Sequence, residues 1–329
     1  MPEHGGRLRR AAEKHGIPLA DWLDLSTGIA PWPWALPEIP ASAWLRLPED
    51  DDGLEQAARL YYGTEHLLPL PGSQAAIQSL PRLRAPGRVG VLSPCYAEHA
   101  HGWKSAGHDL HELSDDRVDE HLDRLDVLVV VNPNNPTGRL LDPSTLLDWH
   151  ARLQRRGGWL LVDEAFMDCM PGHSLLAVGC RPGLIVLRSF GKFFGLAGAR
   201  LGFAFAEPRL LGELGEAIGP WPVSGPTRVI AQSVLADGDG HLLRRRELQA
   251  ASQRLAELLA RHGLAPQGGT ALFQWLRSER SAAVAEHLAQ RGILVRLFDN
   301  PPGLRFGLPP DESGWQRLQR ALAELESHP

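Results

Sequence analysis

The chain has 329 residues, enough for a large α/β domain and a smaller second domain. Its 43% hydrophobic and 22% charged residues are typical of a globular protein and argue against disorder. The net charge of −5 argues against a general nucleic-acid surface, which would need a basic patch. We therefore expect a soluble protein without a nucleic-acid partner.

The amino-terminal sequence MPEHGGRLRRAAEKHGIP has no apolar core of a signal peptide, and no stretch approaches the length of a membrane span. The three cysteines form no CxxC pair, as expected for a reduced protein, and we assign no metal ligands. These features predict a cytoplasmic protein with no membrane partner. Lysines are scarce: Lys14, Lys104 and Lys192 are the whole set, which leaves few candidates for the chemistry of a primary amine.

The first 35 residues include WLDLSTGIAPWPWALP, are rich in turn-forming residues, and are predicted to form an amino-terminal arm (1–35). From about residue 54 to 206, short apolar runs alternate with amphipathic stretches such as AEHAHGWKSAG and PSTLLDWHARLQRRG. Runs dense in Val, Leu and Ile are typical of strands buried on both faces of a parallel sheet. The runs are VGVLSP (89–94), DVLVVVNP (126–133), WLLVDEA (159–165), LIVLRSF (184–190) and ARLGFAFA (199–206).

This alternation predicts a doubly wound, mainly parallel α/β domain over residues 36–222. After the proline-rich GPWPVSGP the pattern changes to two long helical stretches, 227–236 and 242–262. LFQWL, AAVAEHLAQRG, ILVRLF, LRFGL and a final helix follow. We therefore predict a smaller α+β domain over residues 223–329.

The segment SFGKFFGLAGARLG places Lys192 just beyond a buried strand, in a glycine-rich turn that leads to an arginine. Removing a lysine from water lowers the pKa of its amine and makes the amine available to form an imine. Ser189 and Arg200 flank the lysine as donors suited to a phosphate dianion. Taken alone, the segment also fits a solvated lysine beside a structural arginine.

Other strand ends carry polar side chains. Asp163 follows the strand WLLV, and a carboxylate there can keep a pyridine nitrogen protonated, although a helix N-cap is the ordinary alternative. Asn135 in VVVNPNNPTG is placed to reach a ring oxygen, although Asn-Pro turns are common. In LPGSQAAIQ, the backbone N–H groups of Ser73 and Gln74 begin a helix and favour an anion. Tyr96 in SPCYAEH offers a flat ring for stacking.

The order of these motifs resembles the fold-type I enzymes that use pyridoxal 5′-phosphate (PLP), in the branch that contains histidinol-phosphate aminotransferase and L-threonine-O-3-phosphate decarboxylase. The resemblance covers essentially the whole chain. It implies PLP as cofactor and a homodimer. It further implies that Lys192 carries PLP as a Schiff base, that Asp163 meets the pyridine nitrogen and that Asn135 bonds the ring 3′-oxygen. By the same resemblance Tyr96 stacks on the ring, and Ser73, Gln74, Ser189 and Arg200 hold the phosphate.

Three features resemble the threonine-phosphate decarboxylases of cobalamin (vitamin B12) biosynthesis. The amino-terminal EHGGRLRR matches their signature, in which the pair His4-Gly5 closes over the substrate; a solvated tail is the alternative. Phe166 in DEAF stands where aminotransferases usually have a tyrosine. Arg305 in GLRFGLP matches the arginine for the substrate α-carboxylate, and Arg296 in ILVRLF matches a position for the substrate phosphate. A surface arginine is the alternative for Arg296.

Two positions depart from the family pattern. The family often has asparagine where this chain has Gly28, so that substrate contact is lost or supplied by backbone. Leu47 replaces a tyrosine that usually reaches the cofactor phosphate of the neighbouring subunit. Tyr61 and Tyr62 are the open alternatives for this tyrosine. Gly28 and Asn135 complete the predicted substrate contacts.

The resemblance implies decarboxylation of L-threonine O-3-phosphate to (R)-1-amino-2-propanol O-2-phosphate and CO₂. In PLP enzymes, the Cα bond held perpendicular to the ring is the one that breaks, so positioning of the carboxylate selects the reaction. Lys192 is then the natural group to reprotonate Cα. Two alternatives stay open: a histidinol-phosphate aminotransferase or related class II aminotransferase, and a degenerate PLP fold that acts as a binding module. The presence together of Lys192, Asp163 and Arg200 argues against the binding module.

Overall fold

The computed structural model describes residues 5–326, so the predicted contact of His4 lies outside the described residues. By its internal contacts the chain divides into two compact units. The large unit comprises Trp34–Asn135 and Leu140–Leu242. The small unit comprises the chain up to Pro33, the short segment Pro136–Arg139, and the chain from Leu243 onward. The domain limits at 35 and 222 stay a prediction.

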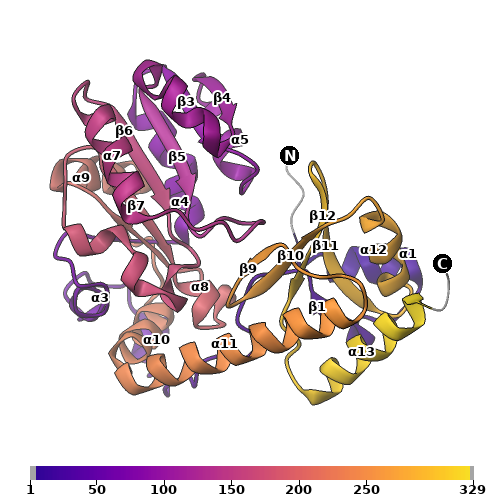
Figure 1. Cartoon of the computed structure of the whole chain (residues 1–329). Coiled ribbons are helices and arrows are strands. Elements are labelled where there is room, and N and C mark those ends of the chain that lie inside the picture. Colours follow the sequence, from indigo (N-terminus) through magenta and orange to yellow (C-terminus); the bar gives the residue numbers. More distant parts are fainter. Residues whose placement is uncertain (1–4, 327–329) are drawn as a thin grey trace. The chain divides into compact units, whose positions relative to one another are not determined.

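The large unit is built on a seven-stranded sheet in the order β2-β8-β7-β6-β5-β3-β4 (Figure 1). The neighbours from β7 to β4 are parallel, whereas β8 is antiparallel to both β7 and β2. The strands are β2 (Leu68–Leu70), β3 (Arg88–Leu92), β4 (Asp109–Leu113), β5 (Val127–Val131), β6 (Trp159–Asp163), β7 (Leu184–Ser189) and β8 (Gly202–Phe205).

Strand β8 was expected within a parallel sheet and runs antiparallel instead. The connection from β7 consists of the single-turn helix α8 (Phe190–Phe193) and the 3-10 turn η8 (Ala197–Ala199). Ser189, the last residue of β7, pairs with Gly202, the first of β8. The chain thus enters β8 at the same end of the sheet at which it left β7. A parallel strand would have needed a crossover connection to the other end of the strands.

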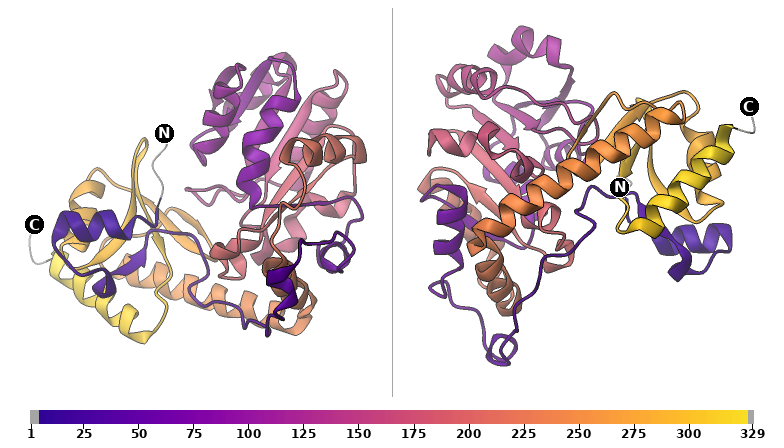
Figure 2. Two further views of the ribbon diagram at one scale, coloured as in Figure 1. Left: turned by 180° about the vertical axis from the view of Figure 1, so that it is seen from behind. Right: turned by 60° about the horizontal axis from the view of Figure 1, so that its bottom comes forward.

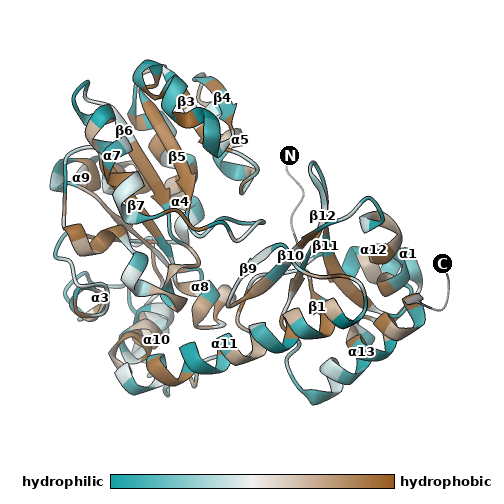
Figure 3. Cartoon of the chain, in the orientation of Figure 1, coloured by the Kyte–Doolittle hydropathy of each residue, from teal (hydrophilic) through white to brown (hydrophobic). Residues whose placement is uncertain are grey.

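Both faces of the parallel strands are buried. Val127 and Val129 of β5 pack in one hydrophobic cluster with side chains of α4, α5 and α9. Leu128 and Val130 alternate with them, are equally buried, and point to the other face. Figure 3 shows the resulting hydrophobic strands between helices whose outer faces are hydrophilic. The helices of this unit are α2 (Ser42–Leu45), α3 (Leu54–Tyr62), α4 (Ser73–Ser79), α5 (Glu98–Ser105), α6 (Val118–His121), α7 (Pro143–Gln154), α9 (Pro208–Ile218) and α10 (Gly225–Ala236).

The small unit contains a five-stranded sheet in the order β1-β11-β12-β10-β9. The amino-terminal strand β1 pairs in parallel with β11, and the remaining pairs are antiparallel. The strands are β1 (Leu23–Leu25), β9 (Gly268–Thr270), β10 (Phe273–Arg277), β11 (Ile293–Asp299) and β12 (Pro302–Gly307). Helices α1 (Leu8–His15), α12 (Ser281–Ala289) and α13 (Glu312–Glu326) belong to this unit, and α11 (Gly238–Arg261) enters it at Leu243.

The amino-terminal segment is integrated into the small unit. Ala11 of α1 packs with Trp22 and Ala289, and Leu23 pairs with Ile293 of β11. Figure 2 shows α1 and β1 beside the carboxyl-terminal elements in both views. The structure therefore confirms an α/β protein with a mainly parallel large sheet and a smaller α+β part. Between residues 5 and 326, no helix has the length and apolarity needed to cross a bilayer.

Candidate active site

A pocket of about 130 Å³ lies in the large unit where strands β5, β6 and β7 end. Ligands of open α/β sheets commonly bind at the carboxyl ends of parallel strands. All eight residues predicted to bind the cofactor line this pocket. Its lining comprises Gly72, Ser73, Gln74, Tyr96, Val131, Asn135, Asp163, Ala165, Phe166, Ser189, Lys192 and Arg200.

Lys192 lies on α8, directly beyond β7. Its neighbours Phe190, Phe193 and Phe194 are fully buried or nearly so and anchor this single helical turn. A Cβ atom on Gly191 would come within 2.8 Å of the Ala197 Cα atom, so only glycine lets the turn fold back this closely. The Lys192 Nζ atom lies 5.9 Å from the centre of the Phe166 ring. The amine therefore faces an apolar ring where a tyrosine would have presented a hydroxyl.

Asp163 ends β6, and its side chain is almost completely buried, with 3% of the residue exposed. The Nε2 atom of His99 lies 2.9 Å from its Oδ2 atom, and the backbone N–H of Ala165 donates to Oδ1 at 3.1 Å. This pairing assigns a proton to Nε2 of His99. The Nδ1 atom of His99 is buried and has no hydrogen-bond partner among the described residues. Sequence reasoning missed His99, because it lies on α5, far from Asp163 in sequence.

Tyr96 and Gln74 form a hydrogen-bonded chain at the pocket wall. The Tyr96 hydroxyl donates to Gln74 Oε1 at 3.1 Å, and Gln74 Nε2 donates to Glu98 at 2.9 Å. Burial, followed by the nearby Glu98 carboxylate, raises the pKa of Tyr96 to about 12, which keeps the phenol neutral at physiological pH. Since the Gln74 side chain is engaged in this chain, its backbone N–H is the group suited to an anion in the pocket.

Close backbone packing brings Arg200 to the first turn of α4. A Cβ atom on Gly72 would come within 2.7 Å of Arg200 Nη2, and one on Gly202 would collide with the backbone nitrogen of Ser73. Arg200 has a left-handed backbone with φ of 52°, a conformation that is uncommon for a residue with a side chain. The guanidinium group and the N–H groups that begin α4 thus combine into a site for a phosphate dianion.

A buried ion network ties β6 and β7 together behind the pocket. Arg188 donates to Glu164 at 2.9 Å and to Asp168 at 2.7 Å, and the Tyr61 hydroxyl donates to Asp168 at 3.0 Å. Burial disfavours the charge of Arg188, but Asp168 and Glu164 overcome this and raise its pKa above the usual value. Because side chains alternate along a strand, Glu164 and Arg188 point away from the face that carries Asp163 and Ser189. The sequence analysis did not identify this network.

In the small unit, Arg296 of β11 and Arg305 of β12 are directly paired across the sheet. Arg305 is 6% exposed, and its Nη2 atom donates to the carbonyl of Ser26 at 2.7 Å. Burial, and then the neighbouring charge of Arg296, lower the pKa of Arg305 to about 10. Two cations on one face of a sheet repel each other, so the pair favours an anionic ligand.

The other residues predicted to contact the substrate are divided between the two units. Gly5 lies against Ser26, because a Cβ atom on Gly5 would collide with the Ser26 carbonyl oxygen. Gly28 is buried in the chain that follows β1. Asn135 lines the pocket of the large unit, whereas Gly5, Gly28, Arg296 and Arg305 belong to the small unit.

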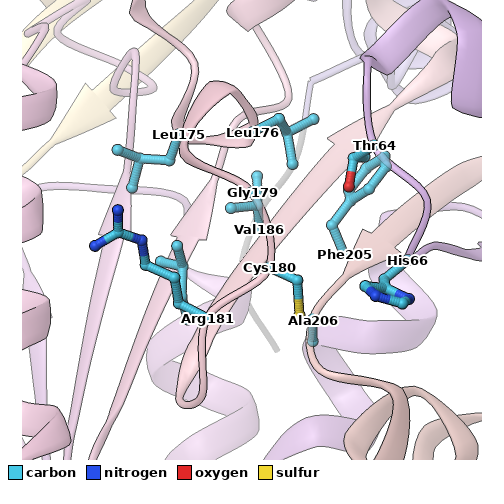
Figure 4. A pocket seen from close by; sticks show the side chains of 11 residues that line it. Thr64, His66, Leu175, Leu176, Gly179, Cys180, Arg181, Val186, Phe205 and Ala206 are labelled. Carbon is cyan, nitrogen blue, oxygen red and sulfur yellow. The ribbon is translucent and has the colours of Figure 1, made fainter.

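A second, smaller pocket of about 20 Å³ lies near the amino end of β7, lined by Leu184, Val186, Phe205 and Cys180 among others (Figure 4). Its volume suits roughly one water molecule. Burial, together with Glu207, raises the pKa of the Cys180 thiol and disfavours the reactive thiolate. This pocket therefore offers neither the room nor the chemistry for a substrate.

Comparison with known proteins gives a consistent result. The model of the family "Aminotransferase class I and II" matches residues 48–322. The chain is 67% identical over 322 residues to the threonine-phosphate decarboxylase of Pseudomonas aeruginosa, which covers 98% of this chain and 97% of the relative. It is 45% identical over 336 residues to the threonine-phosphate decarboxylase of a Sinorhizobium species, covering 98% of both chains. Identity to the histidinol-phosphate aminotransferase of Cronobacter sakazakii is 28% over 292 residues, covering 80% and 78%.

Two solved structures share the fold. The histidinol-phosphate aminotransferase of Clostridium acetobutylicum matches with a TM-score of 0.82 at 20% identity, covering 93% of this chain and 100% of that one. The L-threonine-O-3-phosphate decarboxylase of Porphyromonas gingivalis matches with a TM-score of 0.78 at 19% identity, covering 92% and 99%. These likenesses confirm the predicted aminotransferase fold.

Proposed function

The chain belongs to the aminotransferase class I and II family and, within it, to the threonine-phosphate decarboxylases, and we propose that it decarboxylates L-threonine O-3-phosphate with PLP as cofactor. The products are CO₂ and (R)-1-amino-2-propanol O-2-phosphate. The observation that carries this proposal is the 67% identity over 98% of the chain to a threonine-phosphate decarboxylase. The aminotransferase alternative has weaker support, at 27–34% identity over smaller or more distant matches.

The pocket of the large unit fits PLP. Lys192 supplies the amine that attaches the cofactor, and the buried Asp163 carboxylate supplies the partner for its ring nitrogen. Arg200, Ser189 and the backbone N–H groups of Ser73 and Gln74 would hold its phosphate, and Tyr96 and Asn135, which line the same pocket, would contact the ring. Bound PLP supplies an electron sink for the pair of electrons left at Cα when CO₂ departs.

The protein's own residues set the electrostatics of this step. His99 and the Ala165 N–H hold the Asp163 carboxylate in place by donating to its two oxygens. The Phe166 ring, 5.9 Å from Lys192 Nζ, excludes water from one side of the amine. Lys192 then delivers the proton that Cα takes up after CO₂ has left.

Selection of the substrate depends on the paired arginines of the small unit. Arg305 binds the α-carboxylate and Arg296 binds the phosphate, so the two anionic ends of one substrate meet two adjacent cations. A carboxylate and a phosphate held at once by adjacent cations fix the substrate at two points. Positioning the carboxylate is what selects the Cα bond that breaks.

We place the reaction in cobalamin biosynthesis in the cytoplasm and propose a homodimer. Trp44, Leu45 and Leu47 form an exposed apolar run, with 68%, 83% and 63% of their surfaces accessible, and a second subunit would cover them. The Tyr61 hydroxyl bonds Asp168 and Tyr62 is 8% exposed, which argues against either as a substitute for the tyrosine missing at Leu47. The whole cofactor pocket falls within residues 36–222, which supports that range as the cofactor domain.

The test is incubation of the purified PLP-loaded enzyme with threonine phosphate in the absence of any keto acid. We expect CO₂ and aminopropanol phosphate in equal amounts. A parallel incubation with histidinol phosphate and 2-oxoglutarate should yield no glutamate. Glutamate formation in that second incubation, without CO₂ in the first, would establish the aminotransferase reaction instead.

A further inference from the structure

Ser26, the residue that follows β1, joins three separate parts of the small unit. Its hydroxyl accepts the backbone N–H of Gly6 at 2.7 Å, and its carbonyl accepts Nη2 of Arg305 at 2.7 Å. Its own backbone N–H and hydroxyl both donate to Asp24 Oδ1, at 2.9 and 2.6 Å. Ser26 is 1% exposed. One buried residue thus connects the amino-terminal segment, strand β1 and the arginine of β12.

The direction of these bonds is determined by Asp24. Because the Ser26 hydroxyl gives its proton to the Asp24 carboxylate, its lone pairs face the Gly6 N–H, which can only donate. A serine hydroxyl without such an acceptor would rotate to suit any neighbour. Asp24 therefore fixes Ser26 in the orientation that receives the amino-terminal segment.

The amino-terminal segment is shaped to lie on Ser26. A Cβ atom on Gly5 would collide with the Ser26 carbonyl oxygen, and Gly6 adopts a φ of +77°, which side chains strongly disfavour. Two consecutive glycines thus bring the backbone against the same carbonyl that accepts Arg305. Covering that carbonyl keeps water from competing for the Arg305 hydrogen bond.

We propose that Ser26 is a positioning residue that holds the amino-terminal segment Gly5–Arg7 against the Arg305 site, so that order in this segment and anion binding at Arg305 depend on each other. The identity of the anion, the substrate carboxylate, rests on the proposed function. The coupling itself rests on the contacts of Ser26. Thermodynamic linkage then makes each event favour the other.

The test compares Ser26→Ala with wild type in the full-length, PLP-loaded enzyme. Hydrogen exchange of the peptide that contains Gly6 is measured with and without threonine phosphate, and KM and kcat are measured separately. Loss of one hydrogen bond should raise the rate of exchange at Gly6 by about twofold to tenfold. It should raise KM by about the same factor. The value of kcat should stay near wild type, because Lys192 and Asp163 are untouched.

Ser313→Ala is a matched control. Its hydroxyl also donates to the aspartate two residues earlier, Asp311, at 2.6 Å, but Ser313 lies in the first turn of α13. This control should leave KM and exchange at Gly6 unchanged. A second variant, Gly5→Ala, displaces the segment from the other side, and the double variant with Ser26→Ala should raise KM no further than either change alone.

Three results would overturn the inference: unchanged exchange in Ser26→Ala, a fall in kcat with KM unchanged, or fully multiplicative effects in the double variant. Failure of the proposed function is seen separately, as absence of CO₂ from the wild type. In that case the exchange measurement still tests the contact of Ser26 with Gly6, since it requires no turnover.

Discussion

The pocket of the large unit and the arginine pair of the small unit are held by different means. Around Lys192, functional side chains project from the ends of parallel strands, and the Arg188 network fixes those ends from behind. Around Arg305, the supporting contacts come from the backbone of Gly5 and Gly6 and from the carbonyl and hydroxyl of Ser26. The functional side chains at strand ends belong to sequence motifs that can be recognised. Contacts made by the backbone can be made by many residue types, so the sequence does not reveal them.

The largest expected effect follows Lys192→Ala, which removes the amine of the pocket in the large unit. Turnover and the visible absorption of the bound cofactor should both vanish while the fold persists, as measured by absorption and circular dichroism. Lys104→Ala, on the exposed face of α5, is the control and should retain both signals. If Lys192→Ala still forms a borohydride-stable link to PLP, the cofactor is attached to Lys14 or Lys104 instead.

Arg188→Met tests whether the ion network stabilises the large unit. Two buried carboxylates would lose their cation, and we expect the free energy of unfolding in urea to fall by about 3–5 kcal/mol at pH 8. The matched change Arg152→Met, at a surface pair with Asp119 and Asp123, should cost about 1 kcal/mol or less.

The loss in Arg188→Met should depend on pH. Burial already raises the pKa of Glu164 above its usual value, and Arg188 is the main group that opposes this shift. A group whose pKa is raised by folding contributes stability at low pH, and that contribution disappears as pH rises through the folded pKa. The deficit of the variant should therefore shrink between pH 8 and pH 5. An equal deficit at both values would show that Glu164 does not titrate in this range.

Asp163→Asn should lower kcat by about 10²–10³-fold while PLP affinity changes much less, because the carboxylate acts as charge develops at Cα. Cofactor affinity is measured by titration of the apoenzyme, and kcat by CO₂ release. Asp148→Asn, on the exposed side of α7, serves as the control. Equal losses of affinity and rate would mark Asp163 as a mainly structural group.

A smaller effect than that of Asp163→Asn is expected at the arginine pair. Arg296→Ala should weaken binding of threonine phosphate by about tenfold to a hundredfold, as measured by calorimetry, and should reduce discrimination against unphosphorylated threonine. Arg277→Ala, which removes an exposed cation from neighbouring β10, should leave the affinity unchanged. Wild-type affinity in Arg296→Ala would assign this arginine to the surface.

The residue patterns predicted the fold class and the strands that position the pocket. The runs at 126–133, 159–165 and 184–190 contain β5, β6 and β7, because strands buried on both faces need continuous Val, Leu and Ile. The direction of β8 could not be read in this way, since an apolar run looks the same in either direction. Strand β1 was missed because three residues, Leu23–Leu25, are too few to show a period.

The sequence by itself determined which residues line the cofactor pocket, since each follows a strand or begins a helix in a recognisable motif. Their catalytic and binding roles stay predictions. Only the tertiary structure brought His99 to Asp163, Arg188 to Glu164 and Asp168, and Ser26 to Gly6 and Arg305. The physical reason is that these partners are distant along the chain and ordinary in residue type. Their roles arise from burial and hydrogen-bond geometry, which no local pattern of side chains encodes.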